Sequence, residues 1–290
     1  MDNLRFLSYQ SMGTIWSITI WDKITNEDFD LWSNEIKNKS EIFDQTYSRF
    51  IKNSLVWDIA SGPGVYSVPT DFIQMLNIYF SLYLPSDRKL NPLIGFTISD
   101  LGYDADYRLV PKEKIRVTPD LLETVEIISD SQIRVNKTVL FDFGALGKGY
   151  FVDQIYSFLV SKGLKHILVN GSGDIRYCGP TALRVGLEDP EDEKKVIGKI
   201  LINEGGFCAS GINRRVWDKY HHVIDPSQNS SVDGLLASWV WASTTVWADA
   251  LASCLFFVPP EKISLIPFEY CLMNTERLIK KSADFTADFF

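Results

Sequence analysis

The sequence lacks the features that mark an exported or disulfide-bonded protein. Its few cysteines form no Cys-x-x-Cys motif and stand far apart, at Cys178, Cys208, Cys254 and Cys271. The N-terminus has no basic region followed by an apolar run, and it has no cysteine for lipid attachment. Thiols in a chain without a secretory signal are typically reduced. We therefore expect a cytoplasmic protein.

Basic residues are scarce relative to acidic ones. The chain has 29 Lys and Arg against 37 Asp and Glu, a formal net charge of −8. A nonspecific nucleic-acid binder is normally basic, so this balance argues against that class while leaving room for a local basic pocket. Hydrophobic residues make up 46% and charged residues 23% of the 290 residues. This composition supports a packed core and excludes wholesale disorder.

One apolar stretch raises the question of a membrane span. From Leu235 to Val258 the only charged residue is Asp249, and the length would suffice for a spanning helix. A carboxylate at mid-bilayer would be costly, and serines and threonines interrupt the apolar surface. The first half is rich in Trp, Val and Thr, which is typical of a strand. We predict a buried strand, a turn and a buried helix here, and no membrane span.

The chain also lacks internal repeats, low-complexity linkers and an obvious domain boundary, so we expect one domain over residues 1–290. Strand patterns occupy 12–21, 165–170, 183–187, 197–202 and 270–273, and two short strands are expected within 124–141. Helical patterns occupy 26–40, 69–85 and the residues before Gly163. Loops are expected at 47–54, 91–107 and 188–195. This mixed order predicts an α+β fold of layered mixed sheets with packed helices.

Glycines cluster where a strand at 138–141 is expected to give way to a helix. The run is Asp142-Phe-Gly-Ala-Leu-Gly-Lys-Gly-Tyr-Phe-Val-Asp153. Glycine lets a backbone approach a ligand closely, and the first turn of a helix favours an anion. Lys148 adds a positive charge and Asp142 a carboxylate. A phosphate-bearing ligand or a metal–phosphate pair would suit this layout. A plain strand–turn–helix connection would also account for it, because the spacing matches neither common nucleotide-binding motif.

Two further places carry candidate chemistry. His222 is one of three histidines and stands before Val223-Ile-Asp-Pro. It could act as a base or bind phosphate, or it could be a structural histidine. In a strand, His221 would point to the opposite face.

Asp249 and Ser253 are four residues apart in a helical pattern, so their side chains share one face. These oxygens suit a cation such as Mg²⁺, although a buried structural Asp is the alternative. A serine–histidine–aspartate hydrolase is a weaker rival, because no Gly-x-Ser-x-Gly is present.

Taken together and in order, these segments resemble the FAD:protein FMN transferases, also called the ApbE family. The resemblance covers Met12 to about Phe257. It rests on Met12-Gly-Thr, Tyr47-Ser-Arg-Phe with Asn53-Ser, the Asp142–Asp153 run, Asn170-Gly-Ser-Gly-Asp-Ile-Arg, Ser210-Gly with His222-Val-Ile-Asp-Pro, and Ala248-Asp-Ala-Leu-Ala-Ser253.

The resemblance implies an ApbE-like fold and a reaction. The family moves the FMN half of FAD onto a Thr or Ser hydroxyl of an acceptor flavoprotein through a phosphoester bond, releases AMP and depends on Mg²⁺. The implied metal ligands are the carboxylate of Asp249, the hydroxyl of Ser253 and the main-chain carbonyl of Ala145. His222 would act at the phosphates as a base or an orienting donor. The implied FAD contacts are Met12, Tyr47, Leu101, Gly102, Tyr103, Asp142, Lys148, His222 and Val223.

The sequence departs from the family pattern at a few positions. Ser253 replaces the usual Thr but keeps the hydroxyl. Asn91-Pro replaces Asp-Pro, and Asn170-Gly-Ser-Gly differs from Asn-x-Gly-Gly. The lipoprotein start common in the family is absent. Two rival functions remain open: an FAD pyrophosphatase that hands FMN to water, and a flavin-binding protein without turnover.

Overall fold

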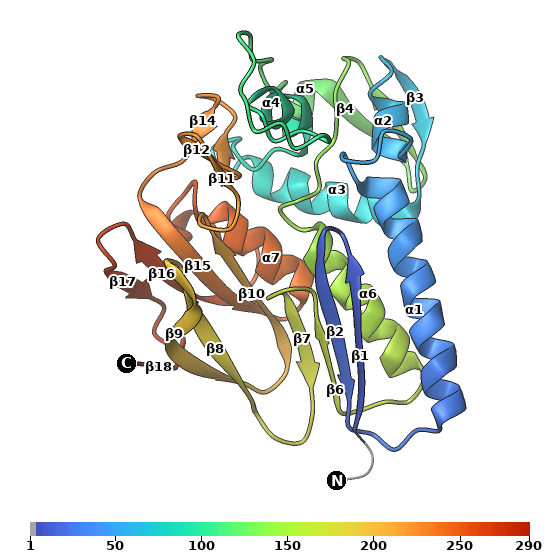
Figure 1. The fold of residues 1–290 in the computed structure, drawn as a ribbon. Helices are drawn as coiled ribbons and strands as arrows, with labels where there is room; N and C mark the ends of the chain where they lie inside the picture. The colour runs from blue at the N-terminus through green and yellow to red at the C-terminus, as the bar shows by residue number, and fades with distance from the viewer. Residues whose placement is uncertain (1–3) are drawn as a thin grey trace.

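The centre of the protein is an antiparallel sheet of eight strands. The computed structural model describes residues 4–290, and Figure 1 shows the path of the chain. In β2 every second side chain is buried, including Trp16, Ile18 and Ile20, as expected for a strand with one face on a core. The spatial order is β1 (Arg5–Ser11), β2 (Thr14–Ile20), β6 (Ile167–Asn170), β7 (Ile175–Cys178), β10 (Gly205–Gly211), β15 (Leu235–Ala242), β16 (Phe268–Asn274) and β17 (Ile279–Lys281).

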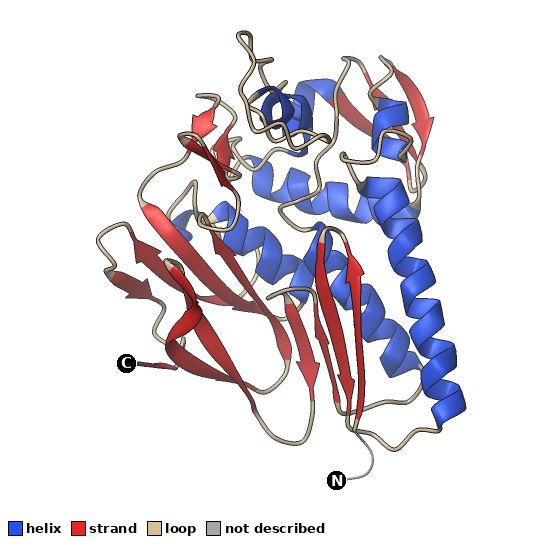
Figure 2. Ribbon diagram, in the orientation of Figure 1, coloured by secondary structure: helices blue, strands red, loops and turns tan. Residues whose placement is uncertain are grey.

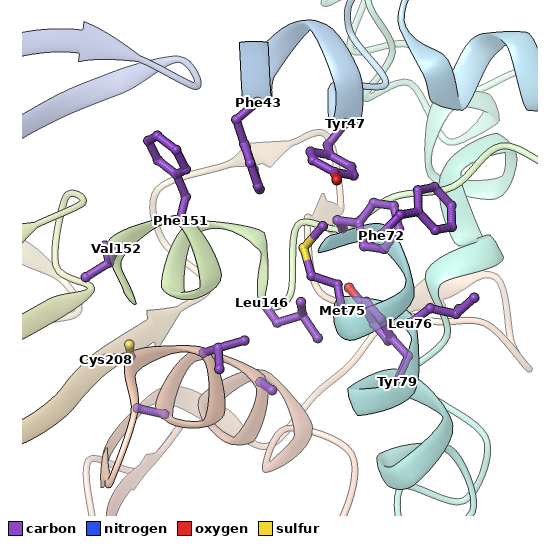
Figure 3. Packing of buried hydrophobic residues seen from close by; sticks show 14 of the residues in the cluster. Phe43, Tyr47, Phe72, Met75, Leu76, Tyr79, Leu146, Phe151, Val152 and Cys208 are labelled. Carbon is purple, nitrogen blue, oxygen red and sulfur yellow. The ribbon is translucent and has the colours of Figure 1, made fainter. Parts of the chain in front are cut away.

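Three long helices cover one face of this sheet (Figure 2). They are α1 (Asn26–Tyr47), α6 (Gly147–Ser161) and α7 (Thr245–Cys254). Figure 3 shows the core around α6, where Phe151 faces Phe43 of α1 with ring centroids 4.8 Å apart. Burial of such aromatic side chains contributes a large share of the hydrophobic stabilisation. This layer therefore holds α6 and α7 rigidly against the sheet.

A small sheet covers the opposite face of the main sheet. Its order is β18 (Ala287–Phe289), β9 (Asp192–Ile202) and β8 (Leu183–Asp189). Along β15, Ala237 and Trp239 pack toward this small sheet, while Val240 and Ala242 pack toward the helices. A strand buried on both faces shows no polar alternation. This explains the apolar run at 235–258, which forms β15 and α7, the strand, turn and helix predicted from the sequence.

The remaining elements form a cap over one end of the main sheet, at the top of Figure 1. The helical elements are α2 (Leu55–Ile59), α3 (Thr70–Tyr83), η1 (Pro92–Ile94), α4 (Gly95–Asp100), α5 (Leu121–Thr124) and η2 (Pro260–Lys262). The strands are β3 (Gly64–Ser67), β5 (Gln132–Val135) and β4 (Val125–Ser129) in one sheet, with short ladders of β11 (Val216–Trp217) with β12 (Tyr220–His221) and β13 (Ile224–Asp225) with β14 (Ser230–Ser231). The α+β class predicted from the sequence is confirmed.

Helices α6 and α7 touch backbone to backbone at Gly149. A Cβ at this position would lie 2.5 Å from the carbonyl oxygen of Thr245 and 2.7 Å from Cβ of Asp249. No real side chain fits at such distances, so glycine is required here for the close approach. The Gly149 amide also donates a 2.9 Å hydrogen bond to Oδ2 of Asp249. Gly149 of the Asp142–Asp153 run therefore joins the two helices that carry Lys148, Asp249 and Ser253.

Two predicted strands differ from the structure. The segment 138–141 is buried from Val139 to Phe141 but belongs to no sheet, because its backbone bonds singly to the segment around η1. The Gly95 amide donates to Leu140 at 3.1 Å, and the Asp142 amide donates to Pro92 at 2.7 Å. The strand predicted at 12–21 begins only at Thr14, since Met12 and Gly13 both have positive φ and form the turn from β1.

Three loop predictions also need correction. Tyr47 is the last residue of α1, which runs beyond the predicted end at residue 40 because Ser40 and Phe43 continue its buried face. The segment 91–107 contains η1 and α4. The charged segment 188–195 is mostly strand, because β8 and β9 pair up to Asp189 and Asp192 and leave only a tight turn between them.

Two expectations about the chain as a whole can be compared with the structure. Within residues 4–290, no helix combines the length and apolar character needed to cross a bilayer. All four cysteines are free thiols, as predicted. The cytoplasmic location stays a prediction.

Candidate active site

Two adjoining cavities lie where the cap meets the main sheet and the ends of α6 and α7. The first cavity has a volume of about 500 Å³ and the second about 550 Å³. They share a wall that includes Arg49, Tyr103, Asp142 and Lys148. Together they form a continuous region large enough for an extended ligand.

Most residues selected from the sequence line these cavities. The first cavity is lined by Tyr103, Asp142, Ala145, Lys148, His222, Val223, Asp249 and Ser253. The second is lined by Met12, Tyr47, Tyr103, Asp142 and Lys148. Segments from β2 to α7 thus meet at one place, although they are separated by more than two hundred residues in the sequence.

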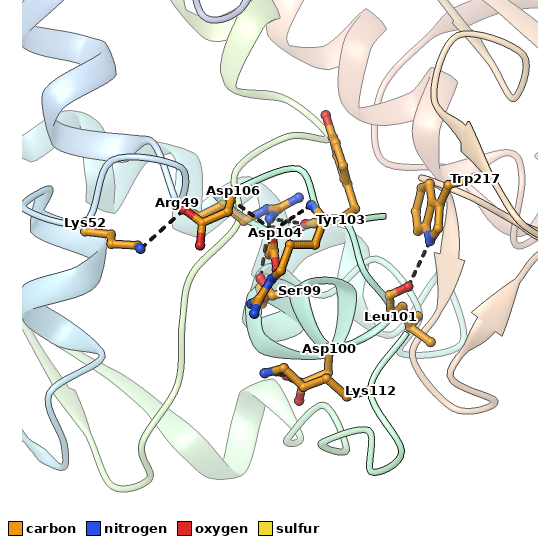
Figure 4. A network of polar contacts seen from close by, with 12 residues as sticks. Arg49, Lys52, Ser99, Asp100, Leu101, Tyr103, Asp104, Asp106, Lys112 and Trp217 are labelled. Carbon is orange, nitrogen blue, oxygen red and sulfur yellow. Dashed lines mark hydrogen bonds and ion pairs between the residues drawn. The ribbon is translucent and has the colours of Figure 1, made fainter. Parts of the chain in front are cut away.

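Leu101 and Gly102 do not line either cavity. Leu101 is fully buried behind the wall, and its carbonyl accepts a 2.8 Å hydrogen bond from the indole of Trp217 (Figure 4). Gly102 has φ +112°, and a Cβ there would lie 2.7 Å from the Val110 amide. These two residues shape the chain that presents Tyr103, and the structure places only Tyr103 of the three in the cavities.

Lys148 and Asp249 line the first cavity, and together with the buried Asp174, which does not line it, they form what we call the floor. Lys148 makes an ion pair with Asp174, and its Nζ lies 3.9 Å from Oδ2 of Asp249. The side chains of Asp174 and Asp249 are 1% and 4% exposed. Buried charges are tolerated only when they are paired, so one lysine holds two carboxylates together here.

Burial and proximity shift the pKa values of this floor. Burial, followed by the neighbouring Asp174 carboxylate, raises the pKa of Asp249 to about 7. Burial opposes the charge of Lys148, but the carboxylates of Asp174 and Asp249 outweigh it and raise the pKa of Lys148 above its usual value. The floor therefore keeps a lysine charged beside a carboxylate that readily exchanges its proton. Such perturbed groups in a cavity are typical of functional sites.

A second charged pair fixes the turn before α6. Nε of Arg49 lies 2.5 Å from Oδ2 of Asp142, and Arg49 Nη1 donates a 2.6 Å bond to the Tyr103 carbonyl. Oδ1 of Asp142 accepts a 2.6 Å bond from the Gly144 amide. The buried hydroxyl of Tyr79 donates to the Asp142 carbonyl at 3.3 Å. The turn that contains Ala145 is thus held from both sides.

His222 and His221 have different surroundings. Nδ1 of His222 is buried and has no hydrogen-bond partner among residues 4–290, whereas His221 bonds the Val232 carbonyl at 2.8 Å. His222 lines the first cavity and His221 does not. Burial, followed by the positive charge of Arg215, lowers the pKa of His222 to about 3. The imidazole is therefore neutral at physiological pH and has a free ring nitrogen.

The second cavity has several aromatic side chains in its wall. Tyr47 lies in its wall with a buried hydroxyl that has no hydrogen-bond partner in the described part of the chain. Met12 enters it from the tip of the β1–β2 hairpin with φ 51°. Tyr103 stacks on Trp217, with ring centroids 5.4 Å apart. Flat aromatic side chains suit a planar ring system.

Two segments, 101–110 and 212–217, border the cavities and combine buried with exposed residues, and we call them the rim. Tyr107 and Val216 are 54% and 59% exposed, and both line the second cavity. Tyr107 and Leu109 have positive φ without being glycine. Arg215, from the second segment, lines both cavities. The rim thus adds aromatic and positively charged groups at the entrance.

The lining residues Arg49 and Tyr79 and the buried Asp174 were given no role from the sequence. Arg49 and Asp174 stand inside motifs that were noted. Tyr79 lies within the helix predicted at 69–85. The signal was available for the two charged residues, because a buried charge requires an opposite charge. The partner could not be identified without the fold, since Arg49 and Asp142 are 93 residues apart.

The oxygen atoms at the floor fit a hard cation. Asp249, Ser253 and Ala145 line the same cavity, and oxygen is the ligand type that Mg²⁺ prefers. Within residues 4–290 no group of three His, Cys, Asp or Glu could hold a metal on its own. A site with one carboxylate, one hydroxyl and one carbonyl would need further oxygens from a ligand, which is how Mg²⁺ sites at phosphates are commonly completed.

The comparisons with known proteins agree with this arrangement. The model of the ApbE family matches residues 12–267. The FAD:protein FMN transferase of Klebsiella pneumoniae (strain 342) is 29% identical over 223 residues, which cover 72% of this chain and 70% of that protein. That of Haemophilus influenzae (strain KW20) is 24% identical over 289 residues, covering 88% and 81%. The crystal structure of the ApbE protein of Thermotoga maritima has a TM-score of 0.83 at 21% identity and covers 98% of both chains. The chain belongs to the ApbE family.

Proposed function

We propose that this protein is an FAD:protein FMN transferase. It moves the FMN part of FAD onto a Thr or Ser hydroxyl of an acceptor flavoprotein and releases AMP. The observation that carries the proposal is the meeting of Lys148, Asp249 and His222 in one cavity that joins an aromatic cavity. The relatives named FAD:protein FMN transferase support the same activity. Because motifs from both ends of the chain build this region, residues 1–290 act as one domain.

We propose that the metal is Mg²⁺, held by Asp249, Ser253 and the Ala145 carbonyl. When bound, Mg²⁺ would neutralise part of the negative charge of the pyrophosphate. The Gly149 amide already bonds Oδ2 of Asp249, which leaves Oδ1 for the cation. Ser253 has a shorter side chain than the family's Thr, but its hydroxyl is on the same helical face as Asp249.

FAD lies across both cavities in this proposal. Lys148 faces the pyrophosphate from the floor, and Asp142, in its pair with Arg49, fixes the neighbouring turn. Arg215 adds a positive charge at the boundary of the cavities. The remaining proposed FAD contacts are Met12, Tyr47, Tyr103, His222 and Val223.

The transfer itself requires positioning and removal of one proton. The acceptor hydroxyl oxygen attacks the phosphorus on the FMN side of the pyrophosphate. A new P–O bond to the acceptor forms, the pyrophosphate P–O bond breaks, and AMP leaves with the bridging oxygen. His222 is the proposed catalytic residue, because its neutral imidazole lines the first cavity and can take the hydroxyl proton. Phosphate negative charge beside the imidazole raises its pKa and strengthens it as a base.

An FAD-labelling assay separates this function from its rivals. The protein is incubated with FAD, Mg²⁺ and a tagged acceptor flavoprotein, and the products are resolved as labelled protein, free FMN and AMP. Fluorescent acceptor together with AMP is the expected result. Free FMN and AMP without labelled acceptor would identify a pyrophosphatase, and FAD binding without AMP would identify a flavin-binding protein. Asp249→Ala, with an unchanged circular dichroism spectrum, should lower the transfer rate by ~10³-fold or more.

A further inference from the structure

Asp153 occupies an unusual place between the two helices of the site. It belongs to α6, five residues after Lys148, and lines neither cavity. Its two carboxylate oxygens accept hydrogen bonds from the first two amides of α7. Oδ1 accepts from Thr245 at 3.1 Å and Oδ2 from Val246 at 2.8 Å. The carboxylate of one helix thus satisfies the open end of the other.

Helix α7 has no cap of its own. Its N-cap residue, Thr244, makes no side-chain capping bond, and the Thr244 hydroxyl is buried without a partner among residues 4–290. The first amides of a helix need acceptors, and a negative charge at that end is favourable. Asp153 supplies both from a neighbouring element.

Arg176 of β7 completes the arrangement. Its Nη1 lies 3.6 Å from Oδ1 of Asp153 and donates to the carbonyl of Ser243, just before α7. Its guanidinium lies over the ring of Tyr156, 4.7 Å from the centroid. The start of α7 is therefore tied to α6 and to the main sheet at once.

These contacts bear directly on the floor of the first cavity. Thr245 and Asp249 are one helical turn apart and share a face of α7. Gly149 contacts both, through the carbonyl of Thr245 and the side chain of Asp249. A shift at the first turn of α7 would therefore move Asp249 against the Gly149 amide and Lys148.

We propose that Asp153 is a positioning residue that sets the orientation of α7, so that Asp249 and Ser253 present their oxygens to the cation. The inference rests on the proposed function for the identity of that site. Asp153 itself touches neither substrate nor metal. It acts through the helix that carries the ligands.

The chain offers a matched control. Oδ2 of Asp22 accepts bonds from the amides of Lys165 and His166, at 2.8 and 2.7 Å. This is also one carboxylate serving two consecutive amides, and Asp22 lines neither cavity. Asp22→Asn and Asp153→Asn therefore remove the same negative charge from a pair of consecutive amides, near the site in one case and away from it in the other.

The test measures Mn²⁺ affinity by isothermal titration of the full chain saturated with FAD, together with thermal unfolding. Asp153→Asn is expected to raise the Mn²⁺ dissociation constant by about 10- to 100-fold, the scale found when groups that orient metal ligands are changed. Asp22→Asn is expected to leave that constant unchanged, and thermal unfolding gives the stability lost in each variant. Equal Mn²⁺ affinities in the two variants would overturn the proposal.

A second variant covers the case in which Asp153→Asn does not fold. Arg176→Gln keeps the Asp153 carboxylate and removes only its support, so a smaller rise in the same constant is expected. An unchanged constant there would count against the proposal. Titration without acceptor separates this inference from the proposed function. If Mn²⁺ affinity depends on Asp153 but no acceptor is labelled, the positioning role stands and the transfer activity fails.

Discussion

The floor and the rim of the site are built on different principles. Lys148, Asp174 and Asp249 are largely buried and stand on or beside packed helices, with Gly149 leaving no space between α6 and α7. The rim is partly exposed and includes residues of positive φ such as Tyr107 and Leu109. A rigid support can hold charged groups in place, while loops can adapt to a ligand. We therefore assign charge placement to the floor and ligand contact to the rim.

The largest expected effect comes from removing the floor lysine. Lys148→Ala leaves the Asp174 carboxylate buried without its partner, which should lower the free energy of unfolding by about 3–5 kcal/mol. FAD binding should weaken by ~1–3 kcal/mol through loss of a charge-assisted contact. Urea unfolding and FAD titration measure the two effects.

A double variant separates stability from binding at the floor. Lys148→Met combined with Asp174→Asn removes both charges, so most of the lost stability should return while FAD affinity stays low. If FAD affinity returned as well, Lys148 would have no direct role toward the pyrophosphate.

The stabilising contributions of two carboxylates should depend on pH in opposite directions. One is Asp249 of the floor, and the other is Asp100 at the end of α4, the helix that leads into the rim segment 101–110. The folded pKa of Asp249, raised to about 7, exceeds its unfolded value, so folding takes up a proton between roughly pH 4 and 7. Its stabilising contribution is complete below about pH 4 and is lost as pH rises toward 7. At the end of α4, burial opposes ionisation of Asp100, but hydrogen bonds from Arg116 and Lys112 lower its pKa to about 2. Its contribution is present above about pH 4 and lost toward pH 2.

Denaturant unfolding of the metal-free protein from pH 3 to 8 measures this contrast. The stability difference between wild type and Asp249→Asn should change between about pH 4 and 7, and that between wild type and Asp100→Asn below about pH 4. If the stability difference from wild type had the same pH dependence in both variants, the predicted contrast between Asp249 and Asp100 would be wrong.

A rim variant should change binding with little effect on stability. The Tyr107 ring stacks on Phe50, with centroids 5.4 Å apart, and is 54% exposed. Tyr107→Ala should weaken FAD binding by about 1 kcal/mol, the value of one aromatic pair. We expect KM for FAD to rise with kcat unchanged. A lower kcat at unchanged KM would instead place Tyr107 with the reacting groups.

The smallest effect is expected at Ser172, where the family pattern has glycine. Ser172 lines the first cavity with φ 61°. Ser172→Gly relieves left-handed strain but gives the unfolded chain more freedom, so stability should change by less than about 1 kcal/mol. Thermal unfolding measures this, and a larger loss would show that the serine side chain makes a stabilising contact.

The sequence was most informative where a residue type itself carries the chemistry. Lys148, Asp249 and His222 were recognised from charge, spacing and setting, and all three line the first cavity. Ala145 was not accessible to such reasoning, because its proposed role uses a main-chain carbonyl. Leu101 was placed too close to the ligand, since its sequence position does not reveal that its side chain points into the core.

Contacts between residues far apart in the chain could not be predicted from the sequence, for a different reason. The Arg49–Asp142 pair and the cap of α7 by Asp153 join segments about ninety residues apart. A local sequence pattern does not reveal which partner a buried charged side chain will contact in the folded protein. The hairpin at Met12 was missed because positive φ at a non-glycine residue is imposed by the surrounding fold.

The contact at Gly149 has a consequence for the speed of the reaction cycle. With α6 and α7 in backbone contact, we expect the two helices to move as one body rather than to separate when FAD enters or AMP leaves. We therefore expect exchange to pass the segments 101–110 and 212–217, and opening of such loops often limits turnover. We therefore expect the rim, rather than the floor and His222, to determine how long the nucleotide stays bound.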